Sequence, residues 1–153
     1  MNIFYAMEKS IISQVRAFNR CYTHLIGLLD RGYLETQYTL TEARILFEID
    51  TGKTNAAEII EEMHIDKSYL SRVLKKFEKN KLITKAKSGR DARASQIGLT
   101  DNGRVELEAL NTLADKQLEK LLKDLSAKEI KQLALHMNSI MEILDQKPAS
   151  RNK

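Results

Sequence analysis

Apolar residues recur at helical spacing near both ends of the chain. Between residues 7 and 30 they are separated by alternating steps of four and three, the spacing of a coiled-coil seam, which predicts one long helix. This seam consists of Ile11, Val15, Phe18, Tyr22, Leu25 and Leu29. A second stripe follows Ser126, which forms a capping-box pattern with Glu129 at the start of a last helix. That stripe consists of Ile130, Leu133, Ala134, Met137, Ile140, Met141 and Leu144.

Three shorter helices are predicted between these ends. Thr41 is expected to cap a helix over 42–50, and Asn55, with Glu58 three residues later, to cap the next one. Asp66 is well placed to cap the third, because a carboxylate accepts hydrogen bonds from the N–H groups of a helix start. In that helix the apolar residues lie at i, i+3, i+4 and i+7, which predicts one buried face. They are Leu70, Val73, Leu74 and Phe77.

The pattern changes after residue 81. Leu82–Lys87 and Ser95–Leu99 are expected to form two short strands around a charged turn, and Thr100 to cap a fifth helix over roughly 101–124. Two short helices joined by a tight break, followed by a hairpin with a cationic tip, are typical of a winged helix-turn-helix. The predicted fold class is mainly α (α+β), with a winged helix-turn-helix core between long N- and C-terminal helices.

The positive charge is concentrated on this predicted core. Residues 66–99 contain ten Lys or Arg and three acids, whereas the whole chain has a net charge of +4, so the remainder is acidic. Such a concentration is what neutralisation of nucleic-acid phosphates requires, and it favours double-stranded DNA as a partner. The alternative of another class is a winged-helix protein-interaction module, in which the same cations would only face solvent.

The composition excludes several other classes. One cysteine among 153 residues rules out an internal disulfide framework, and no apolar run is long enough for a membrane span. No secretory signal is visible, so a cytoplasmic protein without membrane association is expected. The three histidines, His24, His64 and His136, lack the spacing of a metal site. No phosphate-binding glycine loop or catalytic constellation occurs, so we expect no enzyme activity, metal or cofactor.

The terminal stripes predict a homodimer. The winged core is too small to bury both of them, whereas a second copy of the chain buries such stripes with two-fold symmetry. We therefore expect a single chain, 1–153, with a DNA-binding core over 36–100 and a helical dimerisation layer formed by 1–35 and 101–146. A polar tail over 147–153 follows.

One motif carries a family resemblance. The segment Asp91-Ala-Arg93-Ala-Ser-Gln-Ile97-Gly-Leu99-Thr100-Asp-Asn-Gly103 is similar to the wing signature of the MarR family of bacterial transcriptional regulators. With the order of the helices, the resemblance covers about residues 10–145. Short stretches, namely Arg20-x-Tyr22-Thr23, Leu40-Thr-Glu-Ala-Arg44 and Tyr69-Leu-Ser-Arg72, look closest to regulators fused to an acetyltransferase domain. The sequence stops before any such domain, so no acetyltransferase activity is expected.

The resemblance implies roles for individual residues. The chain would be a repressor that binds a palindromic operator and is released by a small-molecule effector. Arg93 would be the wing-tip arginine that enters a minor groove, and Asp91 would orient either Arg93 or Arg72. The implied DNA-contacting residues are Lys67, Ser68, Tyr69, Ser71, Arg72, Lys75, Arg90, Asp91 and Arg93. An effector cavity between the helical layer and the winged core has Phe18, Tyr22 and Arg44 as candidate lining residues.

Two positions complicate this picture. The family usually has a glycine where this chain has Lys81, so the turn before the wing is expected to shift by one residue onto Asn80. Cys21 offers a second alternative, because some members of the family sense peroxide through a cysteine in the first helix. On the apolar seam, however, Cys21 is expected to be buried and poorly reactive.

Overall fold

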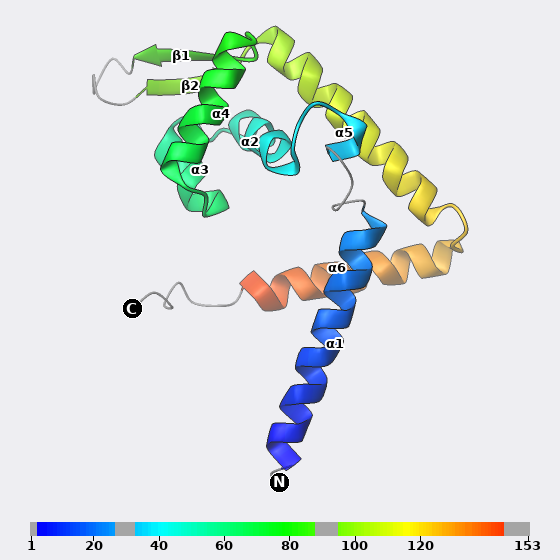
Figure 1. Ribbon diagram of the computed structural model, residues 1–153. Coiled ribbons are helices and arrows are strands. Elements are labelled where there is room, and N and C mark those ends of the chain that lie inside the picture. Colours follow the sequence, from blue (N-terminus) through cyan, green and yellow to red (C-terminus); the bar gives the residue numbers. More distant parts are fainter. Residues whose placement is uncertain (1–2, 27–32, 88–94, 146–153) are drawn as a thin grey trace. The chain divides into compact units, whose positions relative to one another are not determined.

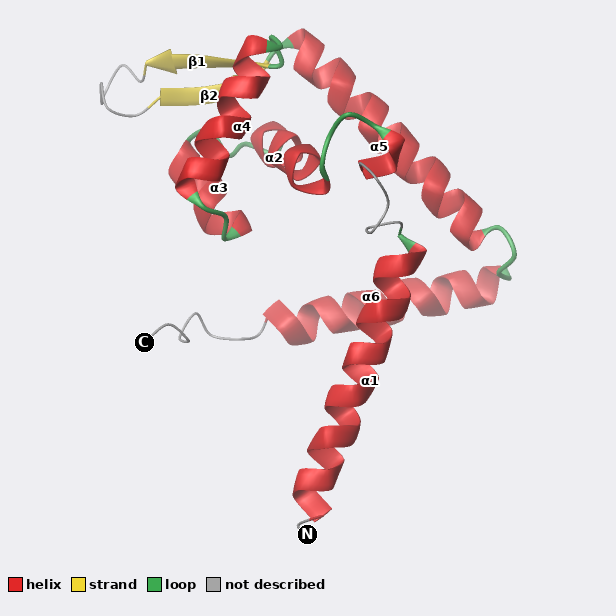
Figure 2. Cartoon of the chain, viewed as in Figure 1, coloured by secondary structure: helices red, strands yellow, loops and turns green. Residues whose placement is uncertain are grey.

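The computed structural model describes residues 3–26, 33–87 and 95–145, which form helices and one small antiparallel sheet (Figures 1 and 2). Residues 1–117 and 118–153 are two compact units, and the boundary falls within the fifth helix. The predicted mainly helical, winged helix-turn-helix architecture is confirmed. In chain order the elements are α1 (Ile3–Leu25), the 3-10 helix η1 (Tyr33–Glu35), α2 (Leu40–Asp50), α3 (Ala56–Met63), α4 (Lys67–Lys79), β1 (Ile83–Lys87), β2 (Ser95–Leu99), α5 (Asp101–Leu122) and α6 (Ala127–Asp145).

The first helix begins earlier than predicted. It runs over Ile3–Leu25 rather than 7–30, because no glycine or proline interrupts residues 3–25. The predicted seam position Leu29 and the end of the predicted helix lie outside the described residues.

The caps predicted at Asn55 and Asp66 are confirmed, but α2 begins two residues before its predicted start. Thr39, not Thr41, caps it. The Thr39 hydroxyl oxygen accepts the Glu42 N–H at 3.1 Å, and a Glu42 carboxylate oxygen accepts the Thr39 N–H at 3.0 Å. This reciprocal capping box needs a Glu or Gln three residues after the threonine, and the residue in that position after Thr41 is Arg44.

The caps of α5 and α6 agree with the prediction. The Thr100 hydroxyl oxygen accepts the Gly103 N–H at 2.9 Å, one residue before α5 begins. At the start of α6, the Ser126 N–H donates to the Glu129 carboxylate at 2.8 Å. The hydrogen bond from the Ser126 side chain, aided by that backbone bond, lowers the pKa of Glu129 below its usual range, which keeps the carboxylate ionised in the capping box.

The sheet is a single hairpin attached to the helical core. β1 and β2 pair antiparallel, with Ile83 opposite Leu99 and Lys87 opposite Ser95. The Ile97 N–H also donates to the Thr54 carbonyl at 2.6 Å, so β2 is bonded on its other edge to the turn between α2 and α3. Leu82, predicted as the first residue of the strand, instead donates its N–H to the Phe77 carbonyl at 2.9 Å and closes α4.

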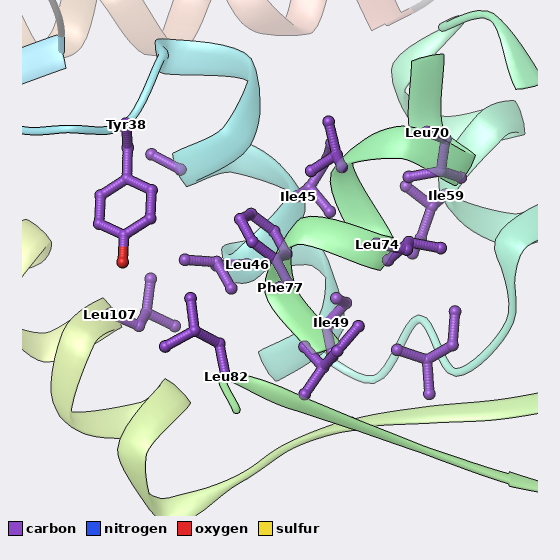
Figure 3. Packing of buried hydrophobic residues seen from close by; sticks show 14 of the residues in the cluster. Tyr38, Ile45, Leu46, Ile49, Ile59, Leu70, Leu74, Phe77, Leu82 and Leu107 are labelled. Atoms are coloured by element: carbon purple, nitrogen blue, oxygen red, sulfur yellow. The ribbon is translucent and has the colours of Figure 1, made fainter. Parts of the chain in front are cut away.

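The core lies between α2, α3, α4, the hairpin and the first turns of α5. Its largest fully buried side chains are Ile45, Leu46, Ile59, Leu70 and Phe77, several of which converge in Figure 3. The predicted apolar face of α4 is confirmed, because all four of its residues are buried. From α5 the buried leucines are Leu107 and Leu110, whereas Val105 is exposed.

The turn after α4 does not shift onto Asn80. Lys81 itself takes the left-handed conformation, with a φ of 56°, whereas Asn80 has a φ of −85°. The reason is tertiary: the Lys81 carbonyl accepts the Thr100 hydroxyl at 2.6 Å, while its N–H donates to the Glu78 carbonyl at 3.0 Å. These two bonds hold the backbone in place although lysine disfavours that conformation.

Candidate nucleic-acid interface

The face of α4 opposite the core carries most of the predicted contact residues. Lys67, Ser68, Ser71, Arg72 and Lys75 are exposed, and Tyr69 is half-buried. Burial of the four apolar positions determines which side of the helix faces the core, so the remaining positions face outward. The result is one exposed strip of cations and hydroxyl groups along α4.

The start of α4 is closed by its own cap. One Asp66 carboxylate oxygen accepts the N–H groups of Ser68 and Tyr69, both at 2.9 Å. The negative charge also favours the positive end of the helix dipole. These two backbone N–H groups are therefore occupied, and an anion approaching α4 would meet side chains first.

The cations of this region differ in their partners. The Arg72 guanidinium carbon lies 6.0 Å from the centre of the Tyr69 ring, within range of a cation–π contact that orients the arginine along the helix. Lys85 on β1 pairs with Glu78 on α4 at 3.0 Å. Lys76 pairs with Glu42 on α2 at 2.8 Å and so lies against the core rather than on the exposed strip. The positive charge available to a partner is consequently smaller than the sequence count.

A hollow of about 450 Å³ adjoins the strip between α3, α4 and the hairpin. Asn55, Lys67, Ser71 and Lys85 supply polar groups to its lining, and apolar side chains such as Ile60 and Ile97 form the rest. Lys85 was not among the predicted contact residues, because nothing in the strand pattern distinguishes it from its neighbours. The predicted wing-tip residues Arg90, Asp91 and Arg93 lie outside the described residues.

A second hollow, of about 200 Å³, lies between η1, α2 and α5. Of the three predicted effector-binding residues, Arg44 lines it, whereas Phe18 and Tyr22 stack on each other with ring centres 5.6 Å apart and are not among its described lining residues. The Arg44 Nε donates to the buried carboxylate of Glu48 at 2.6 Å. Sequence analysis missed the rest of the lining, which is Tyr33, Leu40, Ala43, Phe47, Leu107, Leu110 and Asn111.

The expected burial of Cys21 is wrong for the single chain. Its side chain is exposed on α1, most of whose described side chains face solvent in the isolated chain. Among the described residues, no cluster of His, Cys, Asp or Glu is arranged to hold a metal ion. None of the helices in the described part of the chain is both long and apolar enough to cross a bilayer.

Comparisons with known proteins agree with this geometry. Residues 36–94 match the model of the MarR family. Bordetella bronchiseptica BpsR, studied for the regulation of its DNA binding by 6-hydroxynicotinic acid, superimposes with a TM-score of 0.65 at 15% identity over 84% of this chain and 98% of its own. A mutant of Escherichia coli MarR complexed with operator DNA gives a TM-score of 0.66 at 20% identity, over 92% and 99% of the two chains.

A further solved structure, the MarR family transcription regulator SP03579, gives a TM-score of 0.69 at 18% identity and covers 96% of this chain and 100% of its own. No curated protein sequence matches the chain. At these identities the solved structures establish a shared fold, and the family model covers the segment from α2 into the wing. The predicted resemblance is thereby confirmed: this chain has the fold of the MarR family transcriptional regulators, and its residues 36–94 match the family's model.

Proposed function

We propose that this protein is a sequence-specific DNA-binding transcriptional regulator, acting as a homodimeric repressor on a palindromic operator. The observation that carries the proposal is the exposed strip on α4, which presents both cations and hydroxyl groups on a helix whose other face is buried in the core. A helix of this kind fits the major groove, with hydroxyl groups and Arg72 near base edges and lysines near phosphates. Arg90, Asp91 and Arg93 would act at the wing tip.

The dimer is supported by apolar residues that the single chain leaves exposed. On α1, Ile12 and Val15 are more than half exposed, and on α6 Leu135 is 62% exposed. Helices that each expose several large apolar side chains are typical of elements that form an interface. We propose that 1–35 and 101–146 form the dimerisation layer around the DNA-binding core 36–100, and that 147–153 is a tail.

The effector is proposed to be a small, partly apolar acid in the hollow beside Arg44. An arginine whose Nε is held by a buried carboxylate keeps its other N–H groups oriented, and these can donate to a ligand carboxylate. The apolar side chains around it would contact the rest of the ligand. Effector binding would favour a dimer spacing that does not fit the operator, by a population shift.

Selection from random-sequence duplex DNA tests the DNA-binding proposal directly. The wild type should enrich an inverted repeat whose half-sites are about 10 bp apart, one helical turn, at a stoichiometry of two chains per duplex. Arg72→Ala should lose the enriched sequence. Lys128→Ala, an exposed cation on α6, is the matched control and should retain it.

Failure to enrich any sequence, together with weak and salt-insensitive DNA binding, would favour the protein-interaction module instead. The peroxide-sensing alternative predicts that peroxide releases the enriched duplex from the wild type but not from Cys21→Ser. The exposed thiol makes that comparison straightforward.

A further inference from the structure

Lys76 belongs to the cationic helix by sequence but has a different environment from its neighbours. Its ammonium lies 2.8 Å from a Glu42 carboxylate oxygen on α2. The Glu42 side chain is only 9% exposed, whereas that of Lys76 is 41% exposed. Lys75, one residue earlier, is exposed on the outward strip. The pair therefore joins the last turn of α4 to a nearly buried carboxylate.

Glu42 is itself held in place. Its second carboxylate oxygen accepts the Thr39 N–H at 3.0 Å in the capping box that begins α2. Both oxygens are thus in use, one within α2 and one toward α4. Because the capping box fixes the carboxylate, the ion pair is a rigid point of attachment rather than a contact between two mobile surface chains.

Tyr38 extends this attachment to α5. The Lys76 ammonium lies 5.8 Å from the centre of the Tyr38 ring, and the Tyr38 hydroxyl donates to a Glu106 carboxylate oxygen at 3.1 Å. Burial and the bond to Glu106 raise the pKa of Tyr38 to about 12, so the hydroxyl remains a donor. The Tyr38 ring also packs edge-on against Phe77, with ring centres 6.4 Å apart. One end of α4 is therefore connected to α2 and α5 by directional contacts.

We propose that the Lys76–Glu42 ion pair is a positioning contact for the recognition helix. This inference rests on the proposed function. Apolar packing holds α4 in the core but is non-directional, whereas a charge-assisted hydrogen bond to a fixed acceptor resists rotation of the helix about its axis. Arg72 lies one turn before Lys76 on α4, so a small rotation at Lys76 moves the residues that would face bases. Lys76 determines sequence discrimination without contacting DNA.

Four variants test this, measured with the duplex enriched by the wild type and with a shuffled duplex of the same composition. Lys76→Met removes the charge and keeps the aliphatic chain, and Glu42→Gln removes the charge from the other side while preserving the capping box. Lys76→Arg restores the pair. Lys75→Met is the matched control, since it removes an adjacent exposed cation from the same helix.

The expected results separate positioning from phosphate contact. Lys75→Met should weaken binding to both duplexes and reduce the salt slope of log K by about 0.9 for each lost phosphate contact. Lys76→Met and Glu42→Gln should leave the salt slope unchanged and lower the ratio of the two affinities by about tenfold, the loss of roughly one base contact. A fifth variant that combines Lys76→Met with Glu42→Gln should be no worse than either single variant, because both remove the same ion pair. Lys76→Arg should recover the ratio.

Each other outcome has a definite meaning. A reduced salt slope in Lys76→Met, equal to that of Lys75→Met, would make Lys76 a phosphate contact and overturn the proposal. An unchanged affinity ratio in folded Lys76→Met and Glu42→Gln would show that the pair is only structural, which also overturns it. If the wild type enriches no duplex, the proposed function fails and this proposal fails with it. If the wild type discriminates and the variants do too, only this proposal fails.

Discussion

Replacing Gly103 with alanine would place a methyl group against the backbone of Leu82. The new Cβ would lie 2.9 Å from the Leu82 carbonyl carbon and still closer to its oxygen. That oxygen already accepts the Thr100 N–H at 2.9 Å, at the junction between β2 and α5. Because the neighbouring atoms are backbone, no side-chain rotation can relieve the overlap, and α5 must move away from the end of α4.

The expected net effect is destabilising by about 2–3 kcal/mol. Overpacking costs about 1–3 kcal/mol in ordinary cores, and contact with backbone belongs at the upper end of that range. Distortion of the Thr100–Leu82 hydrogen bond adds about 1 kcal/mol. Against this, alanine favours a helix over glycine by about 1 kcal/mol. Overlap therefore outweighs helix propensity.

Urea unfolding monitored by circular dichroism measures the change in the free energy of unfolding. All variants are compared at one protein concentration, because the stability of a dimer depends on concentration. In thermal unfolding, the melting temperature should fall by about 4–12 °C. Gly98→Ala on β2 is the matched control: a Cβ there meets no atom within 4 Å, so the same chemical change should be nearly neutral. Equal stability of Gly103→Ala and the wild type would refute the close contact between α5 and Leu82.

Four further outcomes are expected. Lys81→Gly should stabilise the fold by about 1 kcal/mol in thermal unfolding, because the left-handed backbone suits glycine; a loss of stability would contradict the turn geometry. The pKa of Tyr38 is raised to about 12 in the folded state, so its hydroxyl contribution to stability is fully present below pH 10. As the pH rises from 10 to about 12 the free energy of unfolding should decrease, and this decrease should be smaller in Tyr38→Phe. Arg93→Ala should weaken binding to the enriched duplex by about 1–3 kcal/mol, and an unchanged affinity would refute the wing assignment. Peroxide should leave the complex intact, because no hydrogen bond or ion pair of the described residues involves Cys21; release abolished by Cys21→Ser would establish the redox alternative.

Several features that depend on residues close together in the sequence were predicted correctly. The apolar spacing of α4 and the cap at Asp66 depend on residues within one helix, so the sequence is sufficient for both. The start of α2 was misplaced although its signal was present, because Glu42 follows Thr39 by three residues and completes the capping box. The left-handed backbone conformation of Lys81 could not be predicted from neighbouring residues, because the hydrogen bond that holds it comes from Thr100, 19 residues later.

In the candidate site, too, features of a single helix were predictable and those formed by several elements were not. Exposure of the α4 strip follows from its periodicity, whereas the hollow beside Arg44 combines residues from η1, α2 and α5 that no spacing rule relates. Phe18 and Tyr22 were proposed as effector-binding residues with the resemblance as their only support; they stack on one another along α1, and their role in effector binding stays a prediction.

Lys75 and Lys76 show why a count of charges overestimates a binding surface. In the sequence the two lysines are equivalent neighbours on a cationic helix, but a rotation of about 100° per residue separates their directions. One is exposed, and the other is paired with a carboxylate 34 residues away. The same applies to Lys85, which Glu78 partly neutralises. Exposed cations such as Lys75 would supply affinity for DNA of any sequence. Lys76, held by Glu42, would instead fix the angle at which α4 presents its side chains to the bases. Affinity and sequence discrimination would then depend on different lysines of one helix.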